Sequence, residues 1–261
     1  METSVLISLY KKNTEEELNR CLISIENQNY TPSEIILIID GPISELLFNC
    51  IQKWSETLPI KSYTLVDNMG LAFALNYGMR HCFNDWVFRI DVDDVCAPGR
   101  FQNQINFVES NPQVDILGGN ILCFSEYPHL FRGRKVPITS RKIYRFMKFR
   151  NPVNHSSVFF NRHKILEIGG YPNARLGQDY LLWINSICNG LRIENMKDVL
   201  VHMQVDSNAH QRRGLKNFSL DSQPYKEMLR LGVTNYFEFS IGISLRFLYC
   251  TYSSLRGVLR L

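Results

Sequence analysis

The stretch Ile35-Ile-Leu-Ile-Ile-Asp-Gly-Pro42 indicates how the first half of the chain folds. Its apolar side chains would point to both faces of an extended chain, which is typical of an interior parallel strand with helices on either side. Asp40-Gly41-Pro42 is a turn signal and ends the predicted strand.

Strand and helix patterns alternate along the sequence before and after this strand. Further strands are predicted at 5–9, 62–66 and 86–90, and helices at 15–27, 44–54 and 71–81. Strands that alternate with helices form right-handed βαβ units and a mostly parallel, Rossmann-like sheet. We therefore predict an α/β fold in which ligands bind beyond the carboxyl ends of the strands.

The second half of the chain has a less regular pattern. Strands are predicted at 114–124, 156–160 and 198–205, and a helix at 179–189. The sequence has no internal repeat and no clear linker, so a single two-part domain is favoured over two independent ones.

Charge is divided unequally between the halves. Residues 1–126 carry 8 Lys and Arg against 17 Asp and Glu, a balance of −9, whereas residues 127–261 carry 21 against 8, a balance of +13. The stretch 127–166 has ten basic residues and no acid. Such asymmetry indicates charged partners. Nucleic acid is not expected, because the sequence contains no recognised nucleic-acid module.

Composition excludes several classes of protein. With 45% hydrophobic residues the chain can bury a sizeable core, so it is not a disordered chain. The seven cysteines are scattered and form no Cys-x-x-Cys pair, which favours a reducing compartment without structural zinc. The sequence begins with no signal peptide, and no stretch reaches the roughly 18 apolar residues of a membrane span. We expect a cytoplasmic location.

Carboxylates cluster directly after the predicted strand 86–90, in Asp91-Val-Asp-Asp94. Asp91 and Asp93 would point the same way if the extended conformation continued. Adjacent carboxylates repel each other unless a divalent cation such as Mg²⁺ or Mn²⁺ lies between them and a phosphate. A solvated acidic turn is the simpler interpretation of an isolated Asp-x-Asp.

Two more polar residues lie at the same predicted edge of the sheet. Asp40 ends a parallel strand, and Asn68 precedes the helix 71–81 as its candidate cap. The N-terminal N–H groups of that helix would face anions. Together with Asp91 and Asp93 these residues predict an acid-rich crevice of the size of a nucleotide.

Seven sequence blocks, taken in order, resemble those of glycosyltransferase family 2. They are Ser4-Val-Leu-Ile-Ser-Leu-Tyr10, Ile39-Asp-Gly41, Asn68-Met-Gly-Leu71 with Ala74-Leu-Asn-Tyr-Gly78, Arg89-Ile-Asp-Val-Asp-Asp94, Arg150-Asn-Pro-Val-Asn-His-Ser-Ser157, Gly169-Gly-Tyr171 and Gln178-Asp-Tyr-Leu-Leu-Trp183. The chain is similar to the bacterial branch that builds O-antigen and exopolysaccharide repeat units, which includes amylovoran-type and galactosyltransferase-like enzymes.

The resemblance implies a GT-A fold with three parts. Residues 1–125 would form the nucleotide-sugar-binding half, and residues 126–214 the acceptor-binding and catalytic half of the same domain. Residues 215–261 would form amphipathic helices that associate with a membrane.

The resemblance also assigns residues to the donor. Tyr10, Asp40, Asn68 and Asp91 would bind the nucleotide, with Asp40 accepting a hydrogen bond from the base. The family usually has two acids before the glycine of the second-strand motif, whereas this chain has Ile39-Asp40. One nucleoside contact is therefore missing, which leaves the base specificity open.

A metal site follows from the same resemblance. Asp93 would hold a Mn²⁺ or Mg²⁺ ion that bridges the two phosphates of the donor. His202 and Asp206 are further candidate metal ligands, and Asp206 lies nearer the position that the family uses.

Asp179 matches the catalytic base of the family's Glu-Asp motif, in which Gln178 replaces the Glu. The base would take a proton from the acceptor hydroxyl as that oxygen attacks the anomeric carbon, opposite the diphosphate, so the configuration inverts. An acid stabilised by the helix dipole is the simpler interpretation of Asp179, and both can hold. By the same resemblance His155, Asn154 and Trp183 would line the sugar and acceptor site together with Gln178.

The implied reaction moves a hexose from a UDP-sugar to a sugar on a polyprenyl diphosphate, with β-1,3-linked galactose as the family-weighted choice. A glucosyl- or N-acetylhexosaminyltransferase of the same pathway type is the alternative. The basic stretch and the tail 236–261 would face the anionic inner leaflet, where each Lys or Arg contributes about 1 kcal/mol of attraction. The protein would then be peripheral on the inner face of the bacterial inner membrane, unless the tail is a packed core helix.

Two other classes fit the sequence less well. A nucleotidyltransferase would need a glycine-rich phosphate loop after the first strand, and Tyr10-Lys-Lys-Asn13 contains no glycine. A non-catalytic nucleotide-binding regulatory domain would be about half this length and would not need Asp179 or the basic half.

Overall fold

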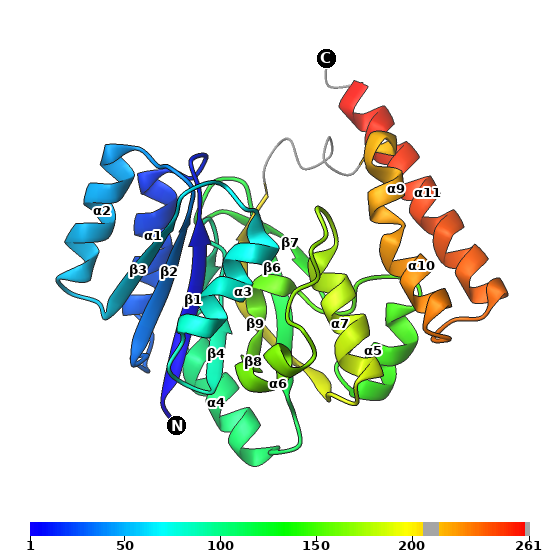
Figure 1. Cartoon of the computed structure of the whole chain (residues 1–261), viewed down its shortest axis with the longest axis horizontal. Coiled ribbons are helices and arrows are strands. Elements are labelled where there is room, and N and C mark those ends of the chain that lie inside the picture. The colour runs from blue at the N-terminus through cyan, green and yellow to red at the C-terminus, as the bar shows by residue number, and fades with distance from the viewer. Residues whose placement is uncertain (206–213, 259–261) are drawn as a thin grey trace.

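A computed structural model describes residues 1–205 and 214–258, with side chains to residue 254. These residues form a nine-stranded sheet with helices on both faces (Figure 1). The strand order is β3-β2-β1-β4-β8-β6-β9-β5, and β7 pairs with β6. The predicted α/β fold with a mostly parallel sheet is confirmed.

Elements alternate regularly up to α4 and less regularly afterwards. The strands are β1 (Thr3–Leu9), β2 (Glu34–Asp40), β3 (Ile60–Leu65), β4 (Trp86–Arg89), β5 (Val95–Cys96), β6 (Ile116–Phe124), β7 (Leu130–Arg134), β8 (Phe159–Asn161) and β9 (Ile193–Gln204). The helices are α1 (Glu15–Glu26), α2 (Glu45–Ser55), α3 (Leu71–His81), α4 (Arg100–Ser110), α5 (Ser140–Met147), α6 (Arg162–Glu167), α7 (Gln178–Cys188), α9 (Phe218–Asp221), α10 (Gln223–Arg230) and α11 (Tyr236–Val258). Short 3₁₀ turns occur at η1 (His155–Ser157) and η2 (Leu215–Asn217).

Strand directions bring several carboxyl ends to one edge of the sheet. β1 pairs in parallel with β2 and β4, and β2 with β3. β8 is antiparallel to both β4 and β6, and β6 is parallel to β9. The carboxyl ends of β1, β2, β4 and β9 therefore lie at the same edge.

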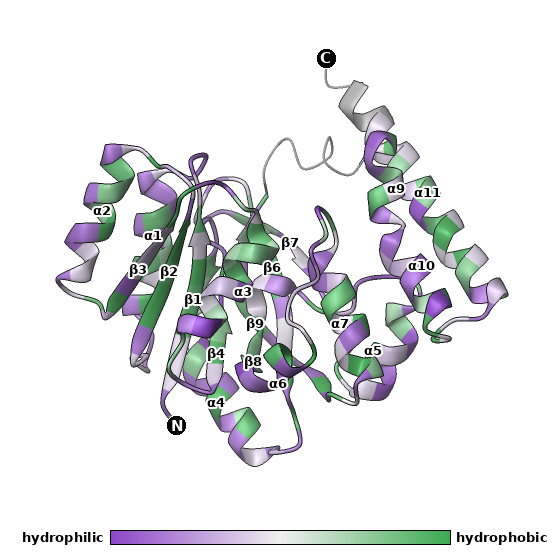
Figure 2. Cartoon of the chain, in the orientation of Figure 1, coloured by the Kyte–Doolittle hydropathy of each residue, from purple (hydrophilic) through white to green (hydrophobic). Residues whose placement is uncertain are grey.

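Alternation of side chains along the strands produces two cores. Val5, Ile7 and Leu9 point to the face that α1, α2 and α4 cover, whereas Leu6 points to the face that α3, α6 and α7 cover. Figure 2 shows the central strands in the apolar colour, while α1 and α2 carry both colours. Both faces are thus buried, as the apolar run in β2 predicts.

The C-terminal helices pack on the second half of the sheet domain. Met147, Tyr180, Ile184, Tyr225 and Met228 are buried together where α5, α7 and α10 meet. Lys148 also donates to Glu238 at the start of α11 (2.7 Å). Within the described residues no helix is long and apolar enough to cross a bilayer.

Three local predictions differ from the structure. Asn68 does not cap α3, because Gly70 occupies the N-cap position and no side chain caps the helix. The predicted strand 156–160 is the turn η1 followed by β8. Helices α4, α5 and α6 are not predicted, and in α5 only Ile143 and Met147 are buried, which is too short an apolar pattern to recognise.

Candidate active site

The acids that follow β4 lie in a tight turn. The N–H of Asp94 donates to the carbonyl of Asp91 (3.1 Å), so the extended conformation on which the predicted orientation of Asp91 and Asp93 rested ends with β4. The carboxylate of Asp91 pairs with the guanidinium of the buried Arg89. Asp94 is 1% exposed, and its Oδ1 accepts from the N–H of Gln204 at the end of β9 (2.9 Å).

This turn concentrates negative charge that the protein does not fully compensate. Burial and the charge of Asp91 raise the pKa of Asp93 to about 7. Burial, with the charges of Asp91 and Asp93, raises the pKa of Asp94 well above its usual range, and the hydrogen bonds from Ser156 and from the N–H of Gln204 oppose this rise. A cation would stabilise the charged forms of these acids.

The donor set fits a hard divalent ion that arrives with a diphosphate. Mg²⁺ and Mn²⁺ are commonly held by one or two carboxylates plus substrate phosphates, and Asp91 and Asp93 offer such oxygens. Among the residues placed in the structure, no three His, Cys, Asp or Glu side chains form a preassembled metal cluster. His202 lies on β9 opposite Val95 of β5, and burial lowers its pKa. Asp206 lies outside the described residues.

Asp40 organises the loop between β3 and α3. It is 4% exposed, and its two carboxylate oxygens accept from the N–H groups of Met69 (2.7 Å) and Gly70 (2.9 Å). The Asn68 amide donates to the Asp40 carbonyl (3.0 Å). Tyr10 follows β1 and is 37% exposed. The topology therefore brings the predicted donor residues to one edge of the sheet, where Asp40 is already committed to backbone contacts.

Asp179 lies in the first turn of α7, where the helix dipole favours a carboxylate. Gln178 is the first residue of this helix. Gly177 precedes it as the N-cap residue and adopts the left-handed conformation, with a φ of 71°. The Asn151 amide donates to Oδ2 of Asp179 (2.7 Å) and fixes the orientation of the carboxylate. The sequence analysis did not single out Asn151, although it lies in the same sequence block as His155.

Four residues are predicted to line the sugar and acceptor site, and two of them, His155 and Gln178, are partly accessible. His155 is half-buried, and its Nε2 lies 2.8 Å from the hydroxyl oxygen of Tyr171. Asn154 is 2% exposed and donates to the carbonyl of Gly119 (2.7 Å), and Trp183 is fully buried. That Asn154 and Trp183 line the site stays a prediction, and both side chains are buried.

Three buried or partly buried polar side chains lie near Asp179 or the acids after β4. They are Tyr171, His155 and Arg89. Burial and the neighbouring Arg89 charge lower the pKa of His155 well below its usual value, so its imidazole is neutral at pH 7. Burial raises the pKa of the Tyr171 hydroxyl; Arg89 opposes this rise, and the charges of Asp179 and Asp91 add to it. The Tyr171 hydroxyl therefore lies within electrostatic range of both Asp179 and Asp91.

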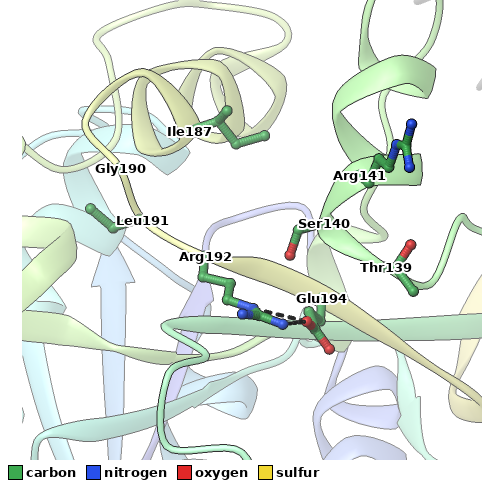
Figure 3. A pocket seen from close by; sticks show the side chains of 8 residues that line it. All are labelled: Thr139, Ser140, Arg141, Ile187, Gly190, Leu191, Arg192 and Glu194. Carbon is green, nitrogen blue, oxygen red and sulfur yellow. Dashed lines mark hydrogen bonds and ion pairs between the residues drawn. The ribbon is translucent and has the colours of Figure 1, made fainter.

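An open hollow lies away from these residues. Its volume is about 500 Å³, and Figure 3 shows that it is lined by the start of α5, the end of α7 and the start of β9, with Arg192 paired to Glu194. Asp179 is at the other end of α7, and a helix of 11 residues is roughly 16 Å long. This hollow is therefore separate from the candidate site.

Comparisons with known proteins agree on one family. The model of the family described as glycosyl transferase family 2 matches residues 4–169. The amylovoran biosynthesis glycosyltransferase AmsE of Erwinia amylovora is 36% identical and is aligned over 89% of this chain and 88% of its own length. The Escherichia coli UDP-Gal:alpha-D-GlcNAc-diphosphoundecaprenol beta-1,3-galactosyltransferase is 35% identical, over 97% of this chain and 93% of its own.

Solved structures show the same fold at low sequence identity. Residues 1–349 of S. aureus TarS, in complex with UDP-GlcNAc, superpose with a TM-score of 0.72 at 16% identity, over 97% of this chain and 74% of that one. The mannosyltransferase PcManGT from Pyrobaculum calidifontis, in complex with GDP-Man and Mn²⁺, gives a TM-score of 0.68 at 16% identity, over 99% and 74%. The predicted GT-A architecture is confirmed.

Proposed function

Because this chain belongs to glycosyltransferase family 2, we propose that it is an inverting, metal-dependent hexosyltransferase that uses a UDP-sugar. The observation that supports the proposal is the pairing of two acidic groups across one site. Asp179 is held by Asn151 at the start of α7, and Asp91 and Asp93 lie in the turn after β4. Tyr171 senses both.

The geometry suits Asp179 as a general base. Asn151 occupies Oδ2, so Oδ1 is the oxygen that accepts the proton of the acceptor hydroxyl. The deprotonating oxygen then attacks the anomeric carbon, while the diphosphate leaves from the opposite face and the configuration inverts. A Mn²⁺ or Mg²⁺ ion on Asp93 would supply Lewis-acid stabilisation of the leaving diphosphate. Asp91, paired with Arg89, would contact the ribose.

The donor and acceptor are proposed from relatives. The Escherichia coli relative is named for UDP-Gal, for an acceptor sugar on a lipid diphosphate and for a β-1,3 linkage, and we assign the same specificity to this chain. Tyr10, Asp40 and Asn68 would bind the nucleoside. A glucosyl- or N-acetylhexosaminyltransferase of the same type of pathway is the alternative, and a donor panel separates the two.

A lipid-linked acceptor requires access to a membrane surface, and α11 has a suitable outer face. Five exposed apolar side chains of this helix fall within about 80° of arc at roughly 100° per residue, whereas the exposed Tyr236, Phe247 and Tyr249 lie outside that arc. The five are Phe237 (74% exposed), Ile241 (36%), Leu245 (51%), Leu248 (63%) and Tyr252 (51%). The opposite face packs inward, where Cys250 and Ser253 are buried and Arg246 pairs with Asp221.

The neighbouring helix α5 adds positive charge. Its exposed Arg141, Lys142 and Arg145 have no ion pair with any described residue, and Lys148 at its end contacts α11 through Glu238. An apolar helix face and cations without an ion pair among the described residues both suit an anionic leaflet. We therefore place the protein peripherally on the cytoplasmic face of the bacterial inner membrane.

Turnover tests the proposed function directly. UDP release from UDP-Gal, UDP-Glc and UDP-GlcNAc is measured with Mn²⁺ or EDTA, with and without a GlcNAc-diphosphate-lipid analogue. We expect release from UDP-Gal to need metal and to rise with the acceptor. Asp93→Ala and Asp179→Asn should each lose more than about 100-fold in rate, whereas Asp198→Asn, at an exposed acid in the middle of β9, should not. Full transfer by folded Asp93→Ala and Asp179→Asn proteins would contradict the assignment.

A further inference from the structure

We infer that Asn76 on α3 is a positioning residue for the catalytic base, because it holds the loop that leads into α7. The inference rests on the proposed role of Asp179. Asn76 touches neither the carboxylates after β4 nor Asp179 itself, so its effect on the reaction would be transmitted through Tyr171.

The contact is a reciprocal pair of hydrogen bonds. Oδ1 of Asn76 accepts from the N–H of Tyr171 (2.8 Å), and Nδ2 of Asn76 donates to the carbonyl of Tyr171 (2.8 Å). One side-chain amide therefore satisfies both backbone polar groups of a residue 95 positions away. Both bonds have good length, and Asn76 is half-buried, which protects them from competition by water.

A glycine allows this close approach. Gly170 precedes Tyr171 and has a φ of +71°, and a Cβ built there would lie 2.3 Å from Oδ1 of Asn76. Any other residue would push the amide away and would strain the backbone. The sequence block Gly169-Gly-Tyr171 thus has a physical role, which is to let the loop reach α3.

The loop has little else to hold it. Between Tyr171 and Gly177 the only backbone hydrogen bond within the described residues joins the N–H of Ala174 to the carbonyl of Pro172 (2.8 Å). The side chain of Tyr171 is fixed by His155, and its backbone is fixed by Asn76. The anchored Tyr171 therefore fixes the start of the segment that leads to Asp179 in the first turn of α7.

Base catalysis is sensitive to such placement. A displacement of about 1 Å at a reacting group can lower a rate by about 100-fold. Loss of the Asn76 amide frees the start of the loop, whereas Asp40, which supports the donor side of α3, keeps its own contacts with Met69 and Gly70. We expect slower chemistry with unchanged donor binding.

The test compares kcat for transfer with donor affinity in Asn76→Ala, Asn76→Asp and a control, Arg80→Ala, at an exposed position on the same helix. We expect Asn76→Ala to lower kcat by about 10- to 100-fold, with the donor KM and the Kd for UDP within about twofold. Asn76→Asp keeps the acceptor for the Tyr171 N–H but loses the donor to its carbonyl, so it should fall between Asn76→Ala and the unmodified protein. Arg80→Ala should match the unmodified protein.

Two outcomes overturn the inference. A folded Asn76→Ala protein with kcat within twofold of the unmodified protein would show that the loop needs no such anchor. An equal loss in donor affinity would show general damage rather than positioning. If Asn76→Ala does not fold, Asn76→Asp provides the same comparison. Asp179→Asn, measured in parallel, separates the two claims: full transfer by it contradicts the proposed base, whereas full transfer by Asn76→Ala alone contradicts only the anchor.

Discussion

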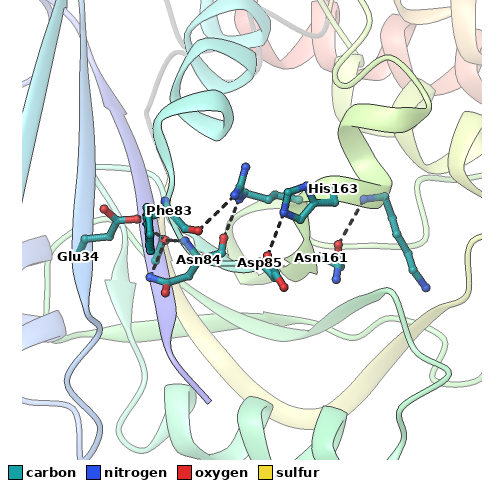
Figure 4. Close-up of polar contacts among 9 residues, drawn as sticks. Glu34, Phe83, Asn84, Asp85, Asn161 and His163 are labelled. Carbon is teal, nitrogen blue, oxygen red and sulfur yellow. Dashed lines mark hydrogen bonds and ion pairs between the residues drawn. The ribbon is translucent and has the colours of Figure 1, made fainter.

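Replacement of the buried Glu34 by Gln should destabilise the fold at neutral pH and less so in acid. Glu34 begins β2 at the edge of the sheet opposite the active site and is 2% exposed. Its Oε1 accepts from the Ser4 hydroxyl (2.7 Å) and from the N–H of Phe83 (2.5 Å), and Oε2 accepts from Nζ of Lys61 (3.0 Å). Figure 4 shows Glu34 beside Phe83 and Asn84 in this cluster.

The magnitude follows from these three bonds. A Gln oxygen can replace Oε1, but its amide nitrogen would then face the Lys61 ammonium, so the bond to Lys61 is lost and the other two bonds lose the assistance of the negative charge. One hydrogen bond to a charged group typically contributes about 1.5–3 kcal/mol to stability. The Lys61 side chain is 58% exposed, so its bond to Glu34 contributes little. We expect Glu34→Gln to lower the free energy of unfolding by about 1–2 kcal/mol at pH 7.

The pH dependence gives a second test. Burial alone would raise the pKa of Glu34, but the N–H of Phe83, the Ser4 hydroxyl and Lys61 outweigh it and lower the pKa. The carboxylate therefore contributes its stability above the unfolded pKa of about 4.3, and this contribution is lost as the pH falls through the lower folded pKa. Urea unfolding at pH 7 and at several acidic values should show a difference between the proteins that shrinks in acid.

The control for this experiment is Glu56→Gln, at an exposed residue after α2, which should leave stability unchanged. Two results would refute the reasoning. One is a Glu34→Gln protein within about 0.5 kcal/mol of the unmodified protein at pH 7, which is the range of ordinary surface substitutions. The other is a difference that stays constant down to the lowest pH at which both proteins fold.

Three further predictions concern the core, the base and the membrane face. Gly78→Ala on α3 would place a Cβ 2.3 Å from Cδ1 of Leu6, so urea unfolding should show a loss of about 1–3 kcal/mol despite the better helix propensity of Ala; a stabilised protein would contradict the contact. Asn151→Ala removes the hydrogen bond to Asp179 and should lower kcat for transfer by about tenfold, and an unchanged kcat in steady-state assays would count against that role. Leu248→Glu, at 63% exposure, should weaken flotation with anionic liposomes at low salt without changing the unfolding midpoint, and flotation equal to that of the unmodified protein would remove α11 from the proposal.

Much of the fold can be predicted from local pattern because the first half repeats one unit. The apolar run in β2 implies helices on both faces, and α1, α2 and α4 on one side with α3 on the other fulfil that implication. Helix α4 is not among the predicted helices, although its Phe101, Ile105 and Val108 have helical spacing. The edge of the sheet at which Asp40 and Asp91 lie follows from strand direction alone.

The contacts within the site could not be predicted in this way. Asn151 and Asp179 are 28 positions apart, and Asn76 and Tyr171 are 95 apart, so no spacing rule relates them. The burial of Trp183 and Asn154 likewise depends on how α7 and η1 pack, which sequence periodicity does not determine. Family resemblance supplied Asp179 and His155, whereas Asn151 and Asn76 emerge only from the folded chain.

The paired bonds between Asn76 and Tyr171 have a wider consequence. The carboxamide of Asn76 offers one acceptor and one donor in a plane, as a peptide group does, so it acts as a surrogate peptide unit and makes the contact that a neighbouring strand would make. Helix α3 and the loop at Tyr171 are thereby joined by the pair of hydrogen bonds that is typical of two neighbouring β-strands, although neither segment is a strand. The amide proton of Tyr171 should consequently exchange with solvent at a rate typical of a sheet, although it lies in a connecting loop.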